Sequence, residues 1–322
     1  MVRPSESVLF GGAGFIGRHV TARLLREDVA RVTVADLRTP DWQLPEGARF
    51  VECDVRQPIA AGLVDSSPAI FNLAAVHRTP GHADHEYFET NEAGARNVTA
   101  FARATTARVI WFTSSIAVYG PSEEAKTEAS PLEPASAYGK SKMVAERIHR
   151  EWAEEGDGRR LVIARPATVF GPGECGNFTR LAGALAQRRF VYPGRRDTRK
   201  ACGYVDDLVS SMLFIEQFAD PVAIYNFGYR EPPTIEEICD AFAAAGSLPL
   251  PRGTIPLAVL LLAARVLRRM GLTSYDPERV MKLVRSTNIR AERLQEYGYE
   301  YETDLRSALA RWQRTDPVGK FV

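Results

Sequence analysis

Seven short apolar runs recur along the chain, and helical patterns separate most of them. The clearest helical patterns cover residues 15–26, 86–105 and 136–155. Strands that are apolar throughout and alternate with helices form parallel sheets covered on both faces. The sequence therefore predicts an α/β fold with a doubly wound parallel sheet of about seven strands. The expected strands are Val8–Phe10, Val32–Ala35, Phe50–Asp54, Ala69–Leu73, Val109–Thr113, Leu161–Ala164 and Ile224–Phe227.

The regular alternation ends after Gly171-Pro-Gly173. Beyond it the sequence looks helical and rich in loops, except that residues 204–228 show a helix and a strand that return to the main sheet. We therefore expect a sheet domain formed by residues 1–173 and 204–228. Residues 174–203 and 229–322 should form a smaller, discontinuous substrate-binding lobe, with the substrate site in the cleft between the two.

Composition narrows the partners of this 322-residue chain. Its net charge of +1 gives no reason to expect nucleic acid or a bulk acidic membrane as a partner. The four cysteines are scattered, which is typical of reduced thiols in a cytoplasmic protein. The longest apolar run, residues 255–264, continues into Arg265, Arg268 and Arg269. This run is too short to span a bilayer and predicts a buried or interface helix.

Gly11, Gly14 and Gly17 follow the first strand and open a helix that includes Phe15 and Ile16. In this context each glycine has a physical role: a tight turn, close approach of the backbone to a pyrophosphate, and close packing of helix on sheet. The helix N-terminus offers free N–H groups and a positive dipole to phosphates. The pattern predicts a Rossmann-type dinucleotide site.

Asp36 ends the second strand, 19 residues beyond Gly17. A carboxylate there can accept hydrogen bonds from both hydroxyls of an adenine ribose and would repel a 2′-phosphate, so NAD is favoured over NADP. NADP remains an alternative cofactor, because Arg38 could bind that phosphate. Asp54, with Val55 beside it, follows the third strand. Asp54 is either a hydrogen-bond partner of the adenine amine or a plain turn residue.

Tyr138 and Lys142 lie four residues apart and so share one helix face. A nearby ammonium should lower the phenol pKa from its ordinary value of ~10. Lys142 can also hold the nicotinamide ribose. Ser115 follows the fifth strand and can hold the reacting oxygen while Tyr138 moves its proton. With the glycine turn, these residues predict a nicotinamide enzyme that moves hydride and proton on a carbinol.

Further motifs link the chain to a known family. They are Asn72-Leu-Ala-Ala75, Asn91 in Thr90-Asn-Glu-Ala-Gly94, Ser115-Ile-Ala-Val-Tyr119-Gly, Arg165-Pro166 with Val169-Phe-Gly-Pro172, and Tyr204-Val-Asp-Asp207. Over nearly its whole length the chain resembles an extended short-chain dehydrogenase/reductase of the NAD-dependent epimerase/dehydratase type.

The resemblance implies roles for particular residues. Ser115, Tyr138 and Lys142 would carry the catalytic roles. It also implies a homodimer formed through the helices near 86–105 and 136–155. The residues implied to line the cofactor are Leu73, Ala74, Ala75, Asn91, Pro166 and Val169, the last two near the nicotinamide.

Two positions after Ser115 separate branches of the family. Sugar-nucleotide dehydratases carry an Asp-Glu pair where Ile116 and Ala117 stand here, and related decarboxylases keep a glutamate at the second position. Neither Ile116 nor Ala117 can transfer a proton. We therefore expect a sugar-nucleotide 4-epimerase, or an oxidoreductase acting at the same carbon, with NAD as cofactor.

Contacts to a nucleotide diphosphate and sugar are expected from scattered side chains. A basic stripe at Arg279, Lys282 and Arg285 would face the pyrophosphate. Of the histidines after the fourth strand, His77 is the best candidate for a substrate-facing loop, and no metal site is expected. The candidate substrate-binding residues are His77, Ser115, Asn177, Arg195, Lys200 and Arg279.

Two alternatives remain open. The first is a hydroxysteroid-dehydrogenase-like oxidoreductase that acts on an apolar alcohol, because residues 255–270 and the tail from Thr287 to Tyr299 resemble such relatives. Thr168 also stands where UDP-galactose 4-epimerases carry an asparagine. The third hypothesis is a non-catalytic NAD-binding regulator. The intact Ser115, Tyr138 and Lys142 argue against it.

Overall fold

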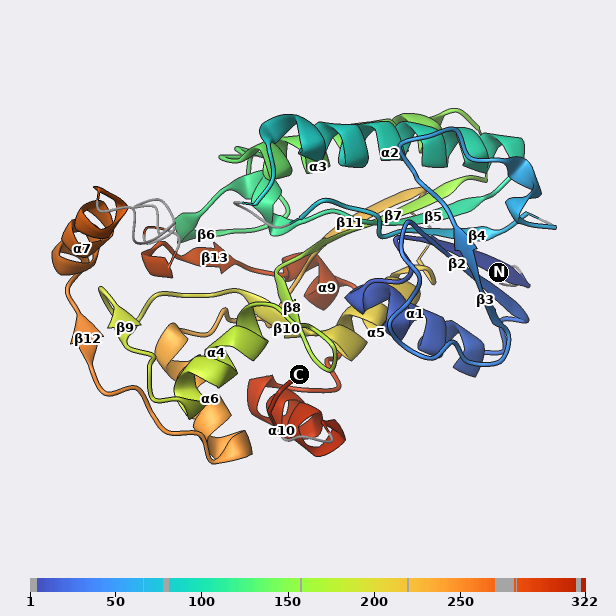
Figure 1. Cartoon of the computed structure of the whole chain (residues 1–322). Helices are drawn as coiled ribbons and strands as arrows, with labels where there is room; N and C mark the ends of the chain where they lie inside the picture. The colour runs from blue at the N-terminus through green and yellow to red at the C-terminus, as the bar shows by residue number, and fades with distance from the viewer. Residues whose placement is uncertain are drawn as a thin grey trace.

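The computed structural model describes residues 5–65, 67–77, 81–156, 158–218, 220–269, 281, 283–316 and 320–322. A seven-stranded parallel sheet forms the centre of the molecule (Figure 1). The order reverses between β4 and β1, which creates the switch point where such sheets bind ligands. The predicted fold class is confirmed. Across the sheet the strands are β11 (Val222–Phe227), β7 (Arg160–Pro166), β5 (Val109–Thr113), β4 (Ala69–Asn72), β1 (Glu6–Phe10), β2 (Arg31–Asp36) and β3 (Ala48–Glu52).

Helices cover both faces of this sheet. The long helices α2 (Asp84–Ala104) and α3 (Ala137–Glu154) lie side by side over one face, and α1 (Phe15–Arg26) and α5 (Val205–Ile215) lie over the other (Figure 1). Successive strand side chains point to opposite faces, so a central strand contributes to both cores. In β1, for example, Val8 and Phe10 pack on the α2 and α3 side, whereas Leu9 packs on the other side.

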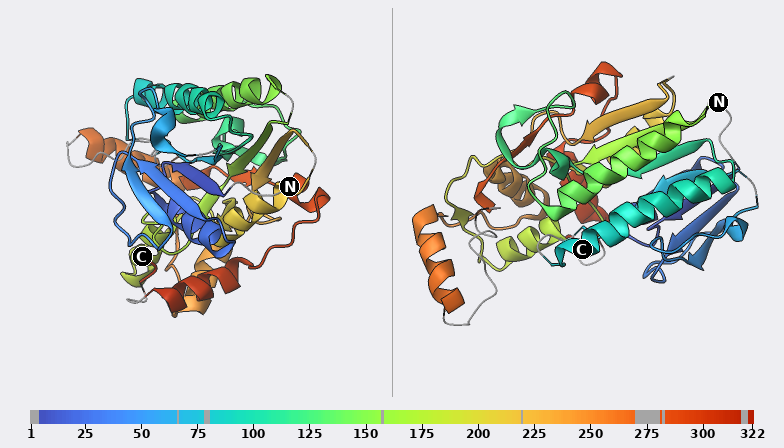
Figure 2. Two further views of the ribbon diagram at one scale, coloured as in Figure 1. Left: turned by 90° about the vertical axis from the view of Figure 1, so that its right-hand side faces the viewer. Right: turned by 90° about the horizontal axis from the view of Figure 1, so that it is seen from above.

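Most of the remaining elements lie in the segments that we assign to the second lobe (Figure 2). Three short parallel ladders, β10 with β8, β12 with β9 and β13 with β6, join segments that are far apart in sequence. In chain order, the elements outside the main sheet and its four covering helices are η1 (Ala61–Leu63), η2 (Ile116–Tyr119), β6 (Ser122–Lys126), β8 (Thr168–Phe170), α4 (Asn177–Ala186), β9 (Tyr192–Pro193), β10 (Cys202–Tyr204), α6 (Ile235–Gly246), β12 (Thr254–Ile255), α7 (Leu257–Arg269), β13 (Thr287–Ile289), α9 (Glu292–Glu296) and α10 (Leu305–Thr315).

The second lobe has its own aromatic core and is also tied to the sheet. Phe170, Phe178 and Trp312 belong to a separate cluster of buried residues. Ala291 and Leu294, from the segment that we assign to this lobe, instead pack into the core beneath the sheet. The lobe is therefore held to the sheet domain by apolar contacts as well as by the ladders.

Candidate active site

The glycine turn after β1 has the geometry of a dinucleotide cradle. Gly11 has φ +75°, and a Cβ there would lie 2.5 Å from the backbone nitrogen of Ala74. A Cβ at Gly17 would lie 2.3 Å from the Gly12 carbonyl oxygen. The fold itself therefore needs both of these glycines. At Gly14, the N-cap of α1, a Cβ would meet nothing closer than the Gly11 carbonyl oxygen at 3.4 Å. The missing side chain at Gly14 therefore leaves the helix N-terminus open to a phosphate.

Asp36 is held beside this turn. Its carboxylate accepts hydrogen bonds from the backbone N–H of Ala13 at 3.1 Å and of Arg38 at 3.2 Å. It stands at the end of β2, next to the switch point, where the second predicted contact to the dinucleotide belongs. The glycine turn and this carboxylate fit the adenosine diphosphate part of NAD. The Arg38 side chain is exposed.

The other predicted cofactor positions end neighbouring strands or follow them. Asp54 is paired with Arg56 through bonds of 2.8–3.0 Å, and the hydrogen bonds from that side chain hold the pKa of Asp54 below its usual range. Val55 packs against Gly94 of α2. The remaining positions follow β4 (Leu73, Ala74 and Ala75), end β7 (Pro166) or lie in β8 (Val169).

Ser115 and Tyr138 are brought together by η2 and α3. Ser115 caps η2, where its hydroxyl accepts a hydrogen bond from the Ala117 N–H at 3.1 Å, and its side chain lies close enough to Tyr138 to influence the pKa of that phenol. Burial raises the pKa of Tyr138 to about 12, although the interaction with Ser115 lowers it. This net shift is the opposite of the one predicted from Lys142, because burial of the phenol outweighs the other effects.

Lys142 lies one turn beyond Tyr138 and is buried. Its Nζ donates to the Thr113 carbonyl oxygen at 2.8 Å and sits 4.8 Å from the centre of the Phe112 ring. Burial lowers the pKa of Lys142 to about 7, with the opposing effect of Glu146 too weak to prevent this. The three predicted catalytic residues therefore gather where β5 ends and α3 begins.

Asn91 fixes the loop after β4 to the catalytic helix. Its Oδ1 accepts from the Val76 N–H at 3.1 Å, and its Nδ2 donates to the Ser141 hydroxyl at 2.8 Å. Ser141 lies between Tyr138 and Lys142 on α3. Asn91, which the resemblance places at the cofactor, therefore holds two walls of the site together.

A buried polar network behind the site was not predicted. Arg165 binds Glu146 through two hydrogen bonds of 2.8 and 2.6 Å, and the Ser114 hydroxyl donates to the same carboxylate at 2.5 Å. Arg165 also donates to the Tyr119 hydroxyl at 2.6 Å, which in turn donates to Asn226 at 2.9 Å. The network links β5, α3, β7 and β11 directly beneath Ser115. The Arg165-Pro166 and Val-Tyr-Gly motifs were its signals in the sequence.

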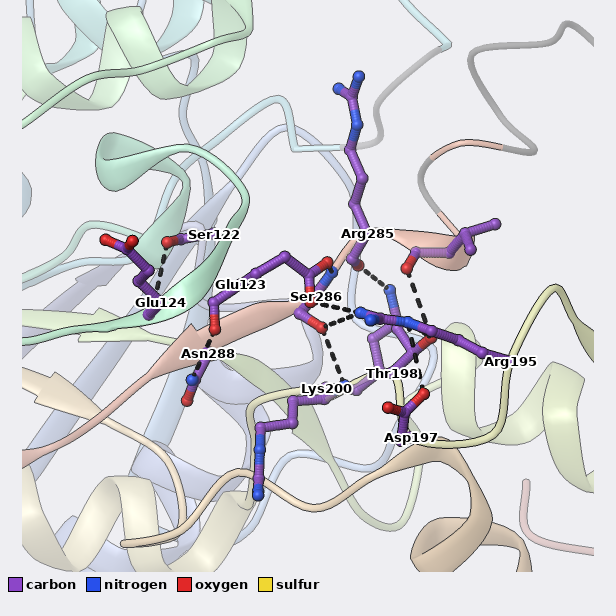
Figure 3. A network of polar contacts seen from close by, with 12 residues as sticks. Ser122, Glu123, Glu124, Arg195, Asp197, Thr198, Lys200, Arg285, Ser286 and Asn288 are labelled. Carbon is purple, nitrogen blue, oxygen red and sulfur yellow. Dashed lines mark hydrogen bonds and ion pairs between the residues drawn. The ribbon is translucent and has the colours of Figure 1, made fainter. Parts of the chain in front are cut away.

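Two of the predicted substrate residues, Arg195 and Lys200, lie together in the second lobe (Figure 3). Arg195 forms an ion pair with Glu123 of β6 and donates to the Ser286 hydroxyl at 2.9 Å. Burial raises the pKa of Glu123, but the bonds from Arg195 and Ser286 outweigh this and lower it to about 2. Lys200 donates to the Arg285 carbonyl oxygen at 2.7 Å, and burial lowers its pKa to about 8. Glu123 of β6, the element after η2, is a partner that sequence reasoning missed.

The other predicted substrate residues are dispersed. Asn177 is exposed at the start of α4 and accepts a hydrogen bond from Arg180 at 3.1 Å. His77 lies in the loop after β4. Arg279 and Lys282, and so most of the predicted basic stripe, lie outside the described residues. Among the residues that the structure does describe, no group of three or more His, Cys, Asp or Glu side chains is placed to hold a metal ion.

Residues 8–228 match the model of the NAD dependent epimerase/dehydratase family. This match covers the glycine turn, Asp36 and all three catalytic candidates. The chain belongs to this family. Its membership explains why the cradle, the carboxylate at the end of β2 and the Ser-Tyr-Lys group occur together on one sheet edge.

Curated relatives include two 4-epimerases. The chain is 30% identical over 223 residues to N-acetyl-alpha-D-glucosaminyl-diphospho-ditrans,octacis-undecaprenol 4-epimerase of Escherichia coli O157:H7, a match that covers 68% of this chain and 66% of that protein. It is 27% identical over 177 residues to UDP-glucose 4-epimerase of Lactobacillus helveticus, and this match covers 53% of each chain. The matched part thus spans between about half and two thirds of these relatives.

A solved structure supports the fold. The chain resembles MoeE5 in complex with UDP-glucose and NAD with a TM-score of 0.76, at 24% identity, over 96% of this chain and 98% of that one. The sheet, the switch point and the attached second lobe are therefore a known arrangement.

Proposed function

We propose that the chain catalyses NAD-dependent 4-epimerisation of a hexose attached to a diphosphate carrier. The observation that carries this proposal is that Ser115 and Tyr138 lie close together at the end of β5, with Lys142 one helical turn away. A hydroxyl pair of this kind can hold one carbinol oxygen and exchange its proton. NAD, when bound at the glycine turn, accepts and returns a hydride.

The chain's own side chains would manage the oxygen and its proton. Ser115 holds the 4-oxygen of the sugar, while Tyr138, in its phenolate form, takes the hydroxyl proton during oxidation and returns it during reduction. Lys142 would hold the nicotinamide ribose when NAD is bound. Since the hydride goes back to the opposite face of the same carbon, atoms and electrons balance without a further reactant.

The absence of a second acid–base pair favours epimerisation over elimination of water. A Cβ added at Gly139, the residue after Tyr138, would lie 2.4 Å from the Ala117 carbonyl oxygen. Position 117 therefore lies against the catalytic helix, where dehydratases of this family need a proton-transferring side chain. Ala117 and the neighbouring Ile116 carry none.

The carrier of the sugar is a diphosphate in both 4-epimerases named above, either undecaprenol-linked or uridine-linked. We propose a nucleotide sugar as the first candidate, bound between the glycine turn and the lobe of residues 174–203 and 229–322. Arg195 and Lys200 are the candidate contacts in that lobe. We further propose a homodimer through the outer surfaces of α2 and α3, which light scattering would test.

The test is epimerisation of UDP-glucose, UDP-N-acetylglucosamine and polyprenyl-diphosphate N-acetylglucosamine, followed by proton NMR of the sugar. We expect interconversion at carbon 4 without net NADH formation. Tyr138→Phe should lower kcat by roughly 10²- to 10⁴-fold while NAD still binds. Tyr87→Phe removes a hydroxyl from a ring 6.1 Å away and serves as the matched control. Full activity of Tyr138→Phe would refute the proposal, and net NADH formation from apolar alcohols would favour the dehydrogenase alternative.

A further inference from the structure

Helix α7 is apolar around most of its circumference yet lies at the margin of the molecule. Figure 1 and the right-hand view of Figure 2 show it set apart from the sheet domain. Ala264 is buried, and Leu257, Leu260 and Leu261 are half-buried on the inner side. The outer side carries three further large apolar residues. Their exposed fractions are 54% for Val259, 62% for Leu262 and 47% for Val266.

These three residues form one stripe. Spacings of three and four residues place Val259, Leu262 and Val266 on the same helix face, opposite the face that packs on the lobe. A helix that is apolar on all sides is normally covered on all sides. The stripe (Val259, Leu262 and Val266) is therefore a surface that needs an occupant.

The charge around the stripe indicates which occupant. Between Asp240 and Asp276 the sequence contains no acidic residue and four arginines, so residues 241–275 carry a formal charge of +4. The whole chain carries only +1, which conceals this local excess. Arg252 and Arg265 are exposed, and two more arginines close the helix. An apolar helix face with cationic residues and no acidic ones complements an anionic lipid surface.

We propose that α7 docks flat on an anionic lipid bilayer. The three stripe residues would enter the boundary between headgroups and acyl chains, while Arg252 and Arg265 extend to lipid phosphates. The 13-residue helix is roughly 20 Å long, shorter than the ~30 Å hydrocarbon core. None of the helices in the described part of the chain is long and apolar enough to cross a membrane. The length of α7 therefore allows docking in the plane of the membrane.

A second copy of the chain fits the stripe less well. The outer face of α7 is roughly 20 Å by 10 Å, or about 200 Å², whereas a stable protein interface buries about 800 Å² on each partner. Two copies meeting at this face would also bring their arginines together. An anionic bilayer needs no shape complementarity, and its negative lipids attract the positive charge of the arginines.

The position of α7 relates docking to the substrate lobe. Leu257, its first residue, packs at Gly194, where a Cβ would lie 3.6 Å from the Leu257 Cβ. Gly194 immediately precedes Arg195, one of the candidate substrate contacts in Figure 3. Docking through α7 would therefore hold the substrate lobe at the membrane surface.

The experiment is flotation of the full-length protein with vesicles. The probes are phosphatidylcholine vesicles with and without an equal part of phosphatidylglycerol, at low and high salt. We expect binding to the anionic vesicles that weakens at high salt. Replacing all three stripe residues by serine should reduce that binding at least roughly tenfold, and Arg265→Gln should reduce it less. Val322→Ser, which alters an apolar side chain that is 52% exposed elsewhere, is the matched control and should bind as the wild type does.

Each contrary outcome is informative. No flotation with either vesicle type would overturn the proposal, as would flotation that the triple variant leaves unchanged. A wild-type dimer that becomes monomeric in the triple variant would instead assign the stripe to contact between copies. Tyr138→Phe should float as the wild type does, so failure of the proposed reaction and failure of docking are separate results.

Discussion

His149 is a buried histidine whose protonation should weaken the fold. Its Nδ1 donates to the Ala145 carbonyl oxygen at 2.7 Å, so Nε2 is the acceptor facing the Asn72 amide at 3.1 Å. The ring stacks on Phe112, with the centres 4.3 Å apart. Burial lowers the pKa of His149 from 6.5 to about 4, and the nearby charge of Lys142 adds to this. The folded protein therefore holds this imidazole neutral.

The lowered pKa sets the size and sign of the effect. Because the unfolded chain binds this proton first as the pH falls, the unfolded state gains stability between pH 6.5 and 4. Each pKa unit corresponds to about 1.4 kcal/mol, so the loss at pH 5 is about 2 kcal/mol and below pH 4 about 3 kcal/mol. Stability from this group is fully present above pH 6.5 and declines as the pH falls.

The assay is urea unfolding at pH 7.5 and pH 5 for the wild type and for His149→Gln. The variant should be less stable at pH 7.5, because it loses the ring contacts, but its stability should fall by about 2 kcal/mol less between the two pH values. His85→Gln removes an exposed histidine and should keep the wild-type pH dependence. An imidazole NMR titration of His149 with a midpoint near 6.5 would refute the reasoning.

Three other substitutions test the fold and the cofactor cradle. Glu146→Gln leaves Arg165 buried without its carboxylate and should cost about 3–5 kcal/mol in urea unfolding at neutral pH; a loss below about 1 kcal/mol would contradict the buried pair. Gly11→Ala should sharply lower the thermal midpoint, since φ is +75° and the new Cβ would meet Ala74. Gly14→Ala should leave that midpoint nearly unchanged but weaken NAD binding at least roughly tenfold by calorimetry; equal affinity would exclude phosphate binding at this helix end.

The sheet was predictable because local pattern decides it. Most strands contain a continuous apolar run, and the predicted and observed bounds of β5 and α1 coincide. The exception is β3 (Ala48–Glu52), which contains Arg49 and lies two residues before the predicted strand Phe50–Asp54. Asp36 and the glycine turn were predictable for a related reason. Their positions depend only on where one strand ends and one helix begins, and both are local properties.

The walls of the second lobe were not predictable in this way. The ladders β10–β8, β12–β9 and β13–β6 contain strands of two to five residues, which are too short to show a period. Their pairing depends on contacts between distant segments. The ion pair between Glu123 and Arg195 is set by those ladders, so a basic residue predicted to bind substrate proves to be bound to the protein's own carboxylate.

Helix α3 shows why polar residues mislead a pattern-based prediction. Tyr138, Lys142, Glu146 and His149 follow one another at spacings of four, four and three, so they lie on one helix face. An amphipathic pattern predicts that charged residues face solvent. Yet the exposed fractions of Lys142, Glu146 and His149 are 1%, 2% and 0%. Each is compensated by a partner from another element: the Thr113 carbonyl, Arg165 and Asn72.

This buried polar face has a consequence for catalysis. Apolar contacts allow a helix to shift slightly, whereas hydrogen bonds weaken steeply with distance and angle. The contacts of Lys142 and Glu146 therefore fix the rotation of α3 about its axis. That rotation determines whether the Tyr138 hydroxyl on α3 comes close to Ser115, which caps η2. Burying the Lys142 ammonium is costly, as its lowered pKa shows, and this cost accompanies a fixed position for the Tyr138 phenol, which we propose acts in catalysis.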